Sequence, residues 1–295
     1  MQYRALGNTG IDVSAVVYGG IVSMDESQEA SDRYVAWAIE QGINYFDVAP
    51  TYGDAQLKLG RSLIPYRDQI YLACKTKART AKEELELFEE SRKLLHSKYF
   101  DVYQMHEMTT MEDVETAFGP DGIMQVLPEL KDKGLIRHIG ITAHSEAVAL
   151  EAIRRFDFET VLFPFNWHMN MAHGMGNTLL KVAKEKGMGV LCMKSMIERA
   201  WNEGEQAGSK YPKSWCKPFD TEKDPDILKA AIKYALSLGV DTIIPPGNFD
   251  HFHFGVEHIE EMLSEPLSEK EKAMLAERLE LVKDRPFFSE DCYKL

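Results

Sequence analysis

The sequence alternates about eight times between a short apolar run that suits a buried strand and a longer amphipathic run that suits a helix. Several of the amphipathic runs end at a glycine or a proline, as helices commonly do. Strict strand–helix alternation without a break in composition favours a parallel sheet, and eight units favour closure into a barrel over an open sheet. We therefore predict a single α/β domain over residues 1–295, a (β/α)8 TIM barrel.

The expected barrel strands are Val13–Tyr18, Ile43–Val48, Ile70–Lys75, Phe100–His106, His138–Thr142, Thr160–Asn166, Met188–Lys194 and Thr242–Ile244. At the N-terminus, residues 1–7 and 11–20 around a Gly-containing turn at residues 8–10 predict a β-hairpin, whose second arm is apolar enough to run inside a sheet. After the barrel strands, Ser268–Lys283 predicts an extra C-terminal helix. Residues 107–120 and 195–225 are expected to be loops, and the rim segment after Asn166 is also expected to be a mobile loop. No GxGxxG follows an early strand, so the best signal for a Rossmann domain is missing.

Charge and cysteine content narrow the partners and the compartment. The net charge of −13 argues against nucleic acid or an anionic membrane surface, because both repel an acidic protein. No apolar run approaches the roughly 20 residues of a membrane span, and the N-terminus lacks the apolar core of a secretion signal. The four cysteines are scattered without a CxxC, as is typical of a reducing compartment. We expect a cytoplasmic protein without nucleic-acid or membrane partners.

Four residues suited to proton transfer follow consecutive predicted strands. Asp47 and Tyr52 lie in FDVAPTYG, Lys75 in IYLACKTK and His106 in FDVYQMHE. In a (β/α)8 barrel the carboxyl ends of the strands share one rim, where the chemistry takes place. There Lys75 would lower the pKa of Tyr52, Asp47 would keep Lys75 charged, and His106 would orient a carbonyl oxygen. Each residue alone is as often structural, but the four together indicate a general acid with electrostatic support.

The sequence resembles the aldo-keto reductase superfamily over nearly its whole length. YRALGNTGIDVSAVVYGG is similar to the N-terminal hairpin and first strand of that family, and FDVAPTYG to the signature with its catalytic Asp and Tyr. Lys75 and the VYQMH segment match the catalytic Lys and His, and KGLIRHIGIT resembles the segment leading into the fifth strand. The resemblance implies a barrel that binds an extended nicotinamide dinucleotide. It also implies reversible carbonyl reduction with Asp47, Tyr52, Lys75 and His106 as the catalytic residues.

The resemblance also implies a set of positions that contact the cofactor. They are Thr142, Asn166, Met193, Lys194, Gly247, Asn248, Glu257 and His258. The chain departs from the family pattern at Ala143 and Leu162, which replace hydrogen-bonding residues, and at Met193, which stands where an aromatic residue usually stacks on the nicotinamide. Lys194 is expected to face the pyrophosphate.

The choice between NADPH and NADH stays open. The family usually takes NADPH and places a Lys or Arg after strand eight to pair with the 2′-phosphate. Here residues 245–251 contain Asp250 and no Lys or Arg, which favours NADH because like charges repel. Three histidines follow, but His251 and His253 point to different faces of a helix, so we expect no metal site.

A small-molecule carbonyl compound is the expected partner, and Glu107, Trp167 and Trp201 are the candidates to contact it. The tail PFFSEDCYKL is expected either to fold over the pocket or to pack on a second copy, so a homo-oligomer stays open. Two other functions remain. One is a lyase or aldolase with Lys75 as a Schiff base, which the adjacent Asp47 disfavours because the amine must be neutral. The other is a nicotinamide-binding regulatory or sensor protein with little turnover.

Overall fold

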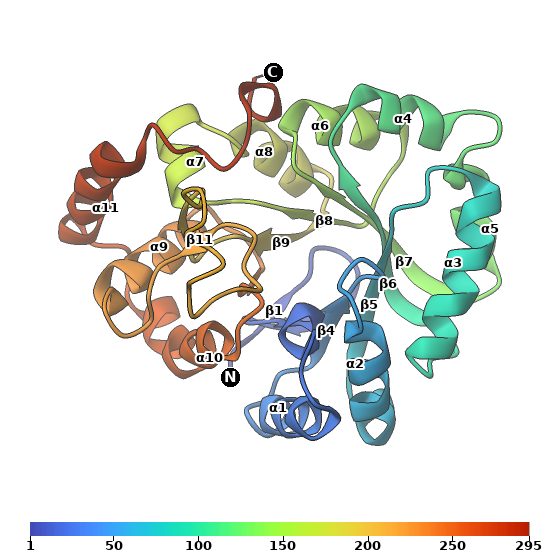
Figure 1. The fold of residues 1–295 in the computed structure, drawn as a ribbon. Helices are drawn as coiled ribbons and strands as arrows, with labels where there is room; N and C mark the ends of the chain where they lie inside the picture. The colour runs from blue at the N-terminus through green and yellow to red at the C-terminus, as the bar shows by residue number, and fades with distance from the viewer. Residues whose placement is uncertain (295) are drawn as a thin grey trace.

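Eight parallel strands form a closed barrel at the centre of the computed structural model, which describes residues 1–294 (Figure 1). In sheet order they are β3 (Tyr18–Gly19), β4 (Tyr45–Val48), β5 (Tyr71–Thr76), β6 (Phe100–Met108), β7 (Ile136–Ala143), β8 (Thr160–Phe163), β9 (Gly189–Met193) and β12 (Thr242–Ile244). A parallel bridge between Val16 and Ile243 closes the ring, with the Val17 amide donating to the Ile243 carbonyl at 2.9 Å. The predicted (β/α)8 fold is confirmed.

Helices surround the barrel, as Figure 1 shows. They are α1 (Gln28–Glu40), α2 (Ala55–Leu63), α3 (Ala81–Leu94), α4 (Met111–Phe118), α5 (Leu127–Asp132), α6 (Glu146–Arg155), α7 (Trp167–His173), α8 (Asn177–Glu185), α9 (Pro225–Ser237), α10 (Phe249–Ser264) and α11 (Glu269–Val282). Short 3₁₀ helices are η1 (Gly20–Ser23), η2 (Ile64–Gln69), η3 (Ile123–Gln125) and η4 (Glu290–Cys292). The side chains of Ser27, Thr80 and Ser268 accept hydrogen bonds from the first turns of α1, α3 and α11, so these helices begin where polar caps are available. No helix in residues 1–294 is both long and apolar enough to cross a membrane.

Alternation along the strands sorts side chains between two apolar layers. On β4, Tyr45 belongs to the cluster inside the barrel, whereas Phe46 and Val48 pack between the barrel and the helices. Cys74 on β5 also packs in the outer layer, as expected, and burial raises the pKa of its thiol to about 12. The same alternation directs Asp47 and Lys75 inward at the carboxyl rim, where both are buried.

The N-terminal hairpin is shorter than predicted. It consists of β1 (Tyr3–Ala5) and β2 (Asp12–Ser14), paired antiparallel. Leu6 and Ile11 belong to the apolar cluster of the barrel interior, so the hairpin closes the end of the barrel opposite the carboxyl rim. The expected first barrel strand, Val13–Tyr18, is therefore divided, because its beginning pairs within the hairpin and only its end enters the barrel.

Two segments predicted to be loops contain helices. In the segment 107–120, α4 begins at a capping box in which Thr110 and Asp113 bond each other's backbone amides. After β8, the Asn166 side chain accepts from the amides of His168 and Met169 and begins α7. The 195–225 segment is mainly irregular, with β10 (Ile197–Arg199) and β11 (Lys217–Pro218) pairing antiparallel within it.

Candidate active site

Asp47 and Lys75 form a buried ion pair at the carboxyl rim of the barrel. Their side chains are 2% and 1% exposed, and the Lys75 ammonium donates to Oδ1 of Asp47. Gln104 Nε2, from β6, donates to the other carboxylate oxygen at 2.9 Å. Burial alone would lower the pKa of Lys75, but Asp47 and Tyr52 raise it above its usual value. Lys75 is therefore a fixed positive charge at neutral pH.

Tyr52 lies directly beside this charge. The Lys75 ammonium donates to the Tyr52 hydroxyl at 3.3 Å and lies 5.0 Å from the centre of its ring. Burial raises the pKa of Tyr52, and Asp47 adds to this effect, whereas Lys75 lowers the pKa. The expectation that Lys75 brings the pKa below its usual value is thus wrong for the free protein, because burial outweighs the ammonium. Tyr52 keeps its proton at neutral pH and has a cation positioned to stabilise the phenolate.

His106 faces the same space as a neutral imidazole. Its ring lies edge-on to Tyr52, with the ring centres 5.9 Å apart. Burial, with the nearby Lys75 ammonium, lowers the pKa of His106 well below its usual value. Its backbone carbonyl accepts from Arg79 Nη2 at 2.8 Å, which fixes the end of β6. The four predicted catalytic residues are therefore brought together as Asp47 on β4, Tyr52 after it, Lys75 on β5 and His106 on β6.

Two pockets meet at Tyr52. One, here called the Pro245 pocket, runs from Tyr52 between Ile21 and Pro245 to Gly247. The other, called the His106 pocket, is lined by His106 among others. The wall that lines both pockets is made of Tyr52, Leu162, Met193, Lys194, Trp215 and Cys216. The four residues thus lie between an apolar groove on one side and a more polar cavity on the other.

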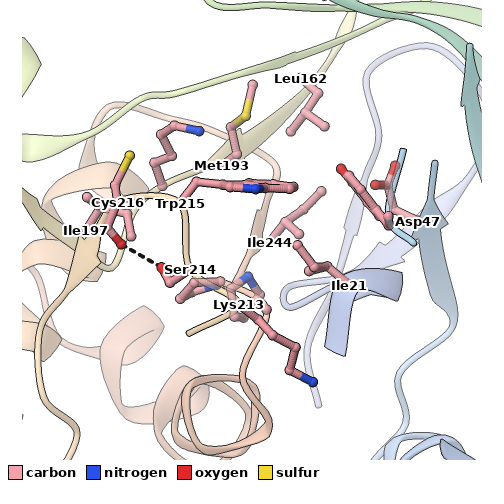
Figure 2. Close-up of a pocket in the computed structure, with 15 residues that line it drawn as sticks. Ile21, Asp47, Leu162, Met193, Ile197, Lys213, Ser214, Trp215, Cys216 and Ile244 are labelled. Carbon is pink, nitrogen blue, oxygen red and sulfur yellow. Dashed lines mark hydrogen bonds between the residues drawn. The ribbon is translucent and has the colours of Figure 1, made fainter. Parts of the chain in front are cut away.

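Trp215 is the aromatic residue of this wall that was not among the candidates from the sequence. Figure 2 shows its indole extending between Met193 and Ile244 towards Asp47. The ring centre lies 5.6 Å from that of Tyr52, and the side chain is 60% exposed. The two tryptophans predicted to contact the substrate, Trp167 and Trp201, line neither pocket and instead bond the backbone of the 195–225 segment. Trp167 is fully buried and donates to the Ile197 carbonyl at 3.0 Å, and Trp201 donates to the Ser214 carbonyl at 2.7 Å.

Lys213 fixes the segment that carries Trp215 across the Pro245 pocket. Its ammonium donates to the carbonyls of Val22 and Met24 at 2.9 and 3.0 Å and to Glu26 Oε1 at 2.7 Å. These residues belong to η1 and the turn after it, which lie on the other side of the pocket from β9. The long segment 195–225 is therefore latched over the groove, and Figure 2 shows the Lys213 ammonium turned away from Trp215.

The expected cofactor positions lie in several different places. Met193, Lys194 and Gly247 line the Pro245 pocket, and Thr142 lines the His106 pocket, where its hydroxyl accepts from the Glu107 amide at 2.7 Å. Asn248 lies at the start of α10, directly after Gly247. Glu257 and His258 lie further along α10 and line a separate surface depression, so the structure does not bring them to the pocket.

Asn166 has no polar atom left for a cofactor. Its Nδ2 donates to the carbonyls of Lys194 and Ile197 at 2.7 and 2.9 Å, and its Oδ1 caps α7. The residue is fully buried. Its amide holds the turn after β9, so the structure does not support the expected cofactor contact of Asn166, which stays a prediction.

Two further observations bear on the fit of a dinucleotide, namely polar groups on the residues next to the lining residues Lys194 and Gly247, and the space at Gly247. The Asn248 amide nitrogen and the Ser195 hydroxyl are buried without a hydrogen-bond partner within residues 1–294, and buried polar groups normally have one. At Gly247, an added Cβ would come within 2.9 Å of the Ile21 side chain, so a larger residue would narrow the groove. Flat apolar walls with a few polar groups at fixed places are typical of cofactor sites.

Glu107 lies at the mouth of the His106 pocket. It takes a left-handed backbone conformation, with φ of 58°, and its carboxylate pairs with Lys77 at 2.5 Å. Its other oxygen lies 3.7 Å from His144 Nδ1. The carboxylate thus faces the cavity, as expected of a substrate contact, but Lys77 already neutralises it.

Comparisons with known proteins agree with this geometry. The model of the aldo/keto reductase family matches residues 16–247. Aldo-keto reductase YhdN of Bacillus subtilis is 30% identical over 164 residues, 49% of this chain and 48% of that protein, so the match spans about half of it. L-galactose dehydrogenase of Arabidopsis thaliana is 28% identical over 269 residues, 80% of this chain and 81% of that protein.

Solved structures show the same fold. The holo form of an aldo-keto reductase from Bacillus halodurans superposes with a TM-score of 0.72 over 99% of both chains at 21% identity. A putative aldo-keto reductase from Pseudomonas aeruginosa has a TM-score of 0.70 over 88% of this chain and 95% of its own, at 20% identity. With the family match over most of its length, the chain belongs to the aldo/keto reductase family and is an NAD(P)H-dependent oxidoreductase of carbonyl compounds.

Proposed function

We propose that the protein reduces an aldehyde or ketone to an alcohol, with Tyr52 as the general acid. The observation that carries the proposal is the contact between the Tyr52 hydroxyl and the Lys75 ammonium, which is itself fixed by Asp47. A phenol with a raised pKa retains its proton until a stronger base appears beside it, namely the alkoxide oxygen that develops as the carbonyl carbon gains hydride. When bound, the reduced nicotinamide supplies a hydride to the carbonyl carbon.

The residues of the chain handle the oxygen and its charge. The electron pair of the C=O π bond moves to oxygen as the carbon gains hydride, and Tyr52 gives its proton to that oxygen. The Lys75 ammonium, 3.3 Å from the hydroxyl, stabilises the phenolate that remains. His106 is neutral and so can donate one hydrogen bond to the carbonyl oxygen without competing for the proton. These roles follow because the pKa of Tyr52 is raised, so that it keeps its proton, and the pKa of His106 is lowered, so that it stays neutral.

The Pro245 pocket is where we place the dinucleotide. Met193 and Trp215 offer apolar surfaces beside Tyr52. Gly247 lines the same pocket, and Asn248 and Ser195 directly follow the lining residues Gly247 and Lys194 in the sequence. Thr142 offers a hydroxyl, although it already accepts from the Glu107 amide. Both NADPH and NADH are candidates, and the acidic residue at position 250, with no Lys or Arg between residues 245 and 258, favours NADH.

One observation argues against a lyase or aldolase that forms a Schiff base at Lys75. An aldolase-type lysine attacks as a neutral amine, whereas the Asp47 carboxylate keeps Lys75 charged and its pKa above the usual value. A sensor protein would bind the nicotinamide cofactor at the same site but reduce carbonyl compounds slowly or not at all. The rate of cofactor oxidation therefore distinguishes it from a reductase.

The test compares binding with turnover in the same protein. Tryptophan fluorescence is titrated with NADPH and with NADH, and oxidation of each is followed at 340 nm with benzaldehyde as a neutral substrate. The proposal expects quenching by at least one cofactor and its oxidation in the presence of the aldehyde. Quenching without oxidation, across a panel of aldehydes and ketones, would support the sensor. No binding of either cofactor would refute the proposed site.

A further inference from the structure

Lys194 is a charged residue held in a strained position at the rim. It follows β9 directly and has a left-handed backbone conformation, with φ of 63°, which is uncommon for a residue with a side chain. Its carbonyl accepts from Asn166 Nδ2 at 2.7 Å and from the Ile197 amide at 3.0 Å. Strained residues of this kind persist where the surroundings fix them, and they gather at functional sites. The buried amide of Asn166 therefore fixes the backbone of Lys194, and with it the position from which the side chain extends.

The Lys194 ammonium lies on the side of the His106 pocket. It stands 5.5 Å from the centre of the Phe288 ring, and Phe288 lines the His106 pocket but not the Pro245 pocket. Burial lowers the pKa of His144 well below its usual value, and the next largest cause is the charge of Lys194. His144 also lines the His106 pocket alone. Both neighbours place the ammonium beside the His106 pocket, although the Lys194 side chain lines both pockets. That it faces a pyrophosphate stays a prediction.

Lys194 carries the one ammonium in this pocket that no carboxylate of residues 1–294 neutralises. Lys75 is paired with Asp47, and Lys77 with Glu107, while Lys194 has no carboxylate oxygen within 4.0 Å in that part of the chain. The two histidines of the pocket, His106 and His144, are neutral at pH 7, since the pKa of each is held well below its usual value. The cavity therefore presents a single uncompensated positive charge to whatever enters it.

We propose that Lys194 binds a carboxylate group of the substrate, so that the preferred substrates are oxo acids, that is, aldehydes or ketones that also carry a carboxylate. A single ammonium neutralises a monoanion, and the Phe288 ring beside it shields the pair from water. This inference rests on the proposed reductase function and adds the substrate class to it. Charge-assisted hydrogen bonds are among the stronger ones in proteins, and removing one is expected to cost about 10- to 100-fold in specificity.

The test measures a specificity ratio. For wild type, Lys194→Met and Lys194→Arg, kcat/KM is determined for 4-carboxybenzaldehyde and for short and long aliphatic oxo acids, each divided by the value for benzaldehyde. Lys181→Met is the matched control, because it makes the same change on the exposed face of α8. We expect the ratio for the best oxo acid to fall 10- to 100-fold in Lys194→Met, to recover substantially in Lys194→Arg and to stay within about threefold in Lys181→Met.

Other outcomes overturn the inference. A ratio that is the same in wild type and Lys194→Met, or that falls equally in the Lys181 control, would mean that Lys194 does not recognise the substrate anion. A rise in the dissociation constant of NADH or NADPH in Lys194→Met, with the ratio unchanged, would return the residue to the cofactor.

A binding experiment separates this inference from the reductase proposal. Benzoate, which cannot be reduced, is titrated against wild type and Lys194→Met with Trp215 fluorescence as the signal. If wild type reduces neither class of aldehyde, the reductase proposal fails. Benzoate binding that is lost in Lys194→Met would still establish the anion site, and equal binding by the two proteins would refute it.

Discussion

The Lys75 ammonium donates to the Tyr52 hydroxyl at 3.3 Å while it is bound on its other side by Asp47. This relationship couples the acidity of the phenol to a buried charge that cannot move. It also means that two residues from successive strand ends depend on one ion pair for their protonation state.

The rate of reduction should depend on pH through Tyr52. The acid must carry its proton, and burial raises the pKa of Tyr52 above its usual value of 10, so kcat/KM should be level through neutral pH and fall only at high pH. In Lys75→Met the cation that lowers this pKa is gone, so the descending limb should move to still higher pH while the plateau drops about 10²- to 10⁴-fold. Profiles of kcat/KM against pH for the two proteins test this. A descending limb near pH 7 in wild type would contradict it.

Breaking the ion pair from one side should destabilise the fold. Asp47→Asn leaves the buried Lys75 ammonium without its counter-charge, which typically costs about 3–5 kcal/mol. The double variant Asp47→Asn/Lys75→Met removes both charges and should recover a substantial part of that loss. Urea unfolding of the three proteins measures the effect. A double variant less stable than Asp47→Asn would contradict this, because it would mean that the unpaired Lys75 ammonium is not the cause of the lost stability.

Glu84 should make stability depend on pH near neutrality. This residue of α3 is fully buried, and within residues 1–294 its carboxylate oxygens make no hydrogen bond of good geometry. Burial raises its pKa from 4.5 to about 7, although the nearby hydroxyls of Thr76 and Tyr103 oppose this shift. Since the folded state holds the proton more tightly than the unfolded state, the stabilisation is complete below about pH 4.5 and is lost as pH rises through about 7. Glu84→Gln should therefore gain about 1–3 kcal/mol over wild type at pH 8 and little at pH 5. Equal differences at the two pH values would contradict this.

The latch made by Lys213 should slow the release of a bound cofactor. Its three contacts to η1 and the following turn hold the Trp215 segment over the groove. Lys213→Ala should raise the dissociation rate of the bound dinucleotide roughly tenfold, because one charge-assisted contact and two backbone contacts are lost. Lys210→Ala is the control, since Lys210 pairs only with Asp220 and Glu222 of the same segment. Stopped-flow tryptophan fluorescence measures the rates, and equal rates in both variants would contradict the latch.

The fold and the position of Asp47, Tyr52, Lys75 and His106 at one rim could be predicted because each depends on short stretches of sequence. Strand–helix alternation carries the barrel, and the residues that end β4, β5 and β6 reach one rim in any barrel of this order. The helix α4 lies wholly within residues 107–120, which were predicted to be a loop, although Thr110 and Asp113 form a capping box that marks where it begins.

The rest of the site depends on contacts between distant segments. Trp215 reaches the pocket because Lys213 bonds residues about 190 positions away, and no local pattern encodes that closure. Asn166 was assigned to the cofactor from its position after β8, whereas its amide is used by α7 and by the turn after β9. The net pKa of Tyr52 was misjudged for a related reason, since burial is a property of the folded pocket and not of the motif.

The most direct test of the account is a single-turnover experiment on Tyr52→Phe. Cofactor binding is followed by tryptophan quenching, and hydride transfer to an aldehyde by loss of the 340 nm absorbance. The account predicts that Tyr52→Phe binds NADH or NADPH within about threefold of wild type and transfers hydride at least about 100-fold more slowly, because the proton donor is missing. Hydride transfer at the wild-type rate in Tyr52→Phe would contradict the central claim that Tyr52 is the general acid.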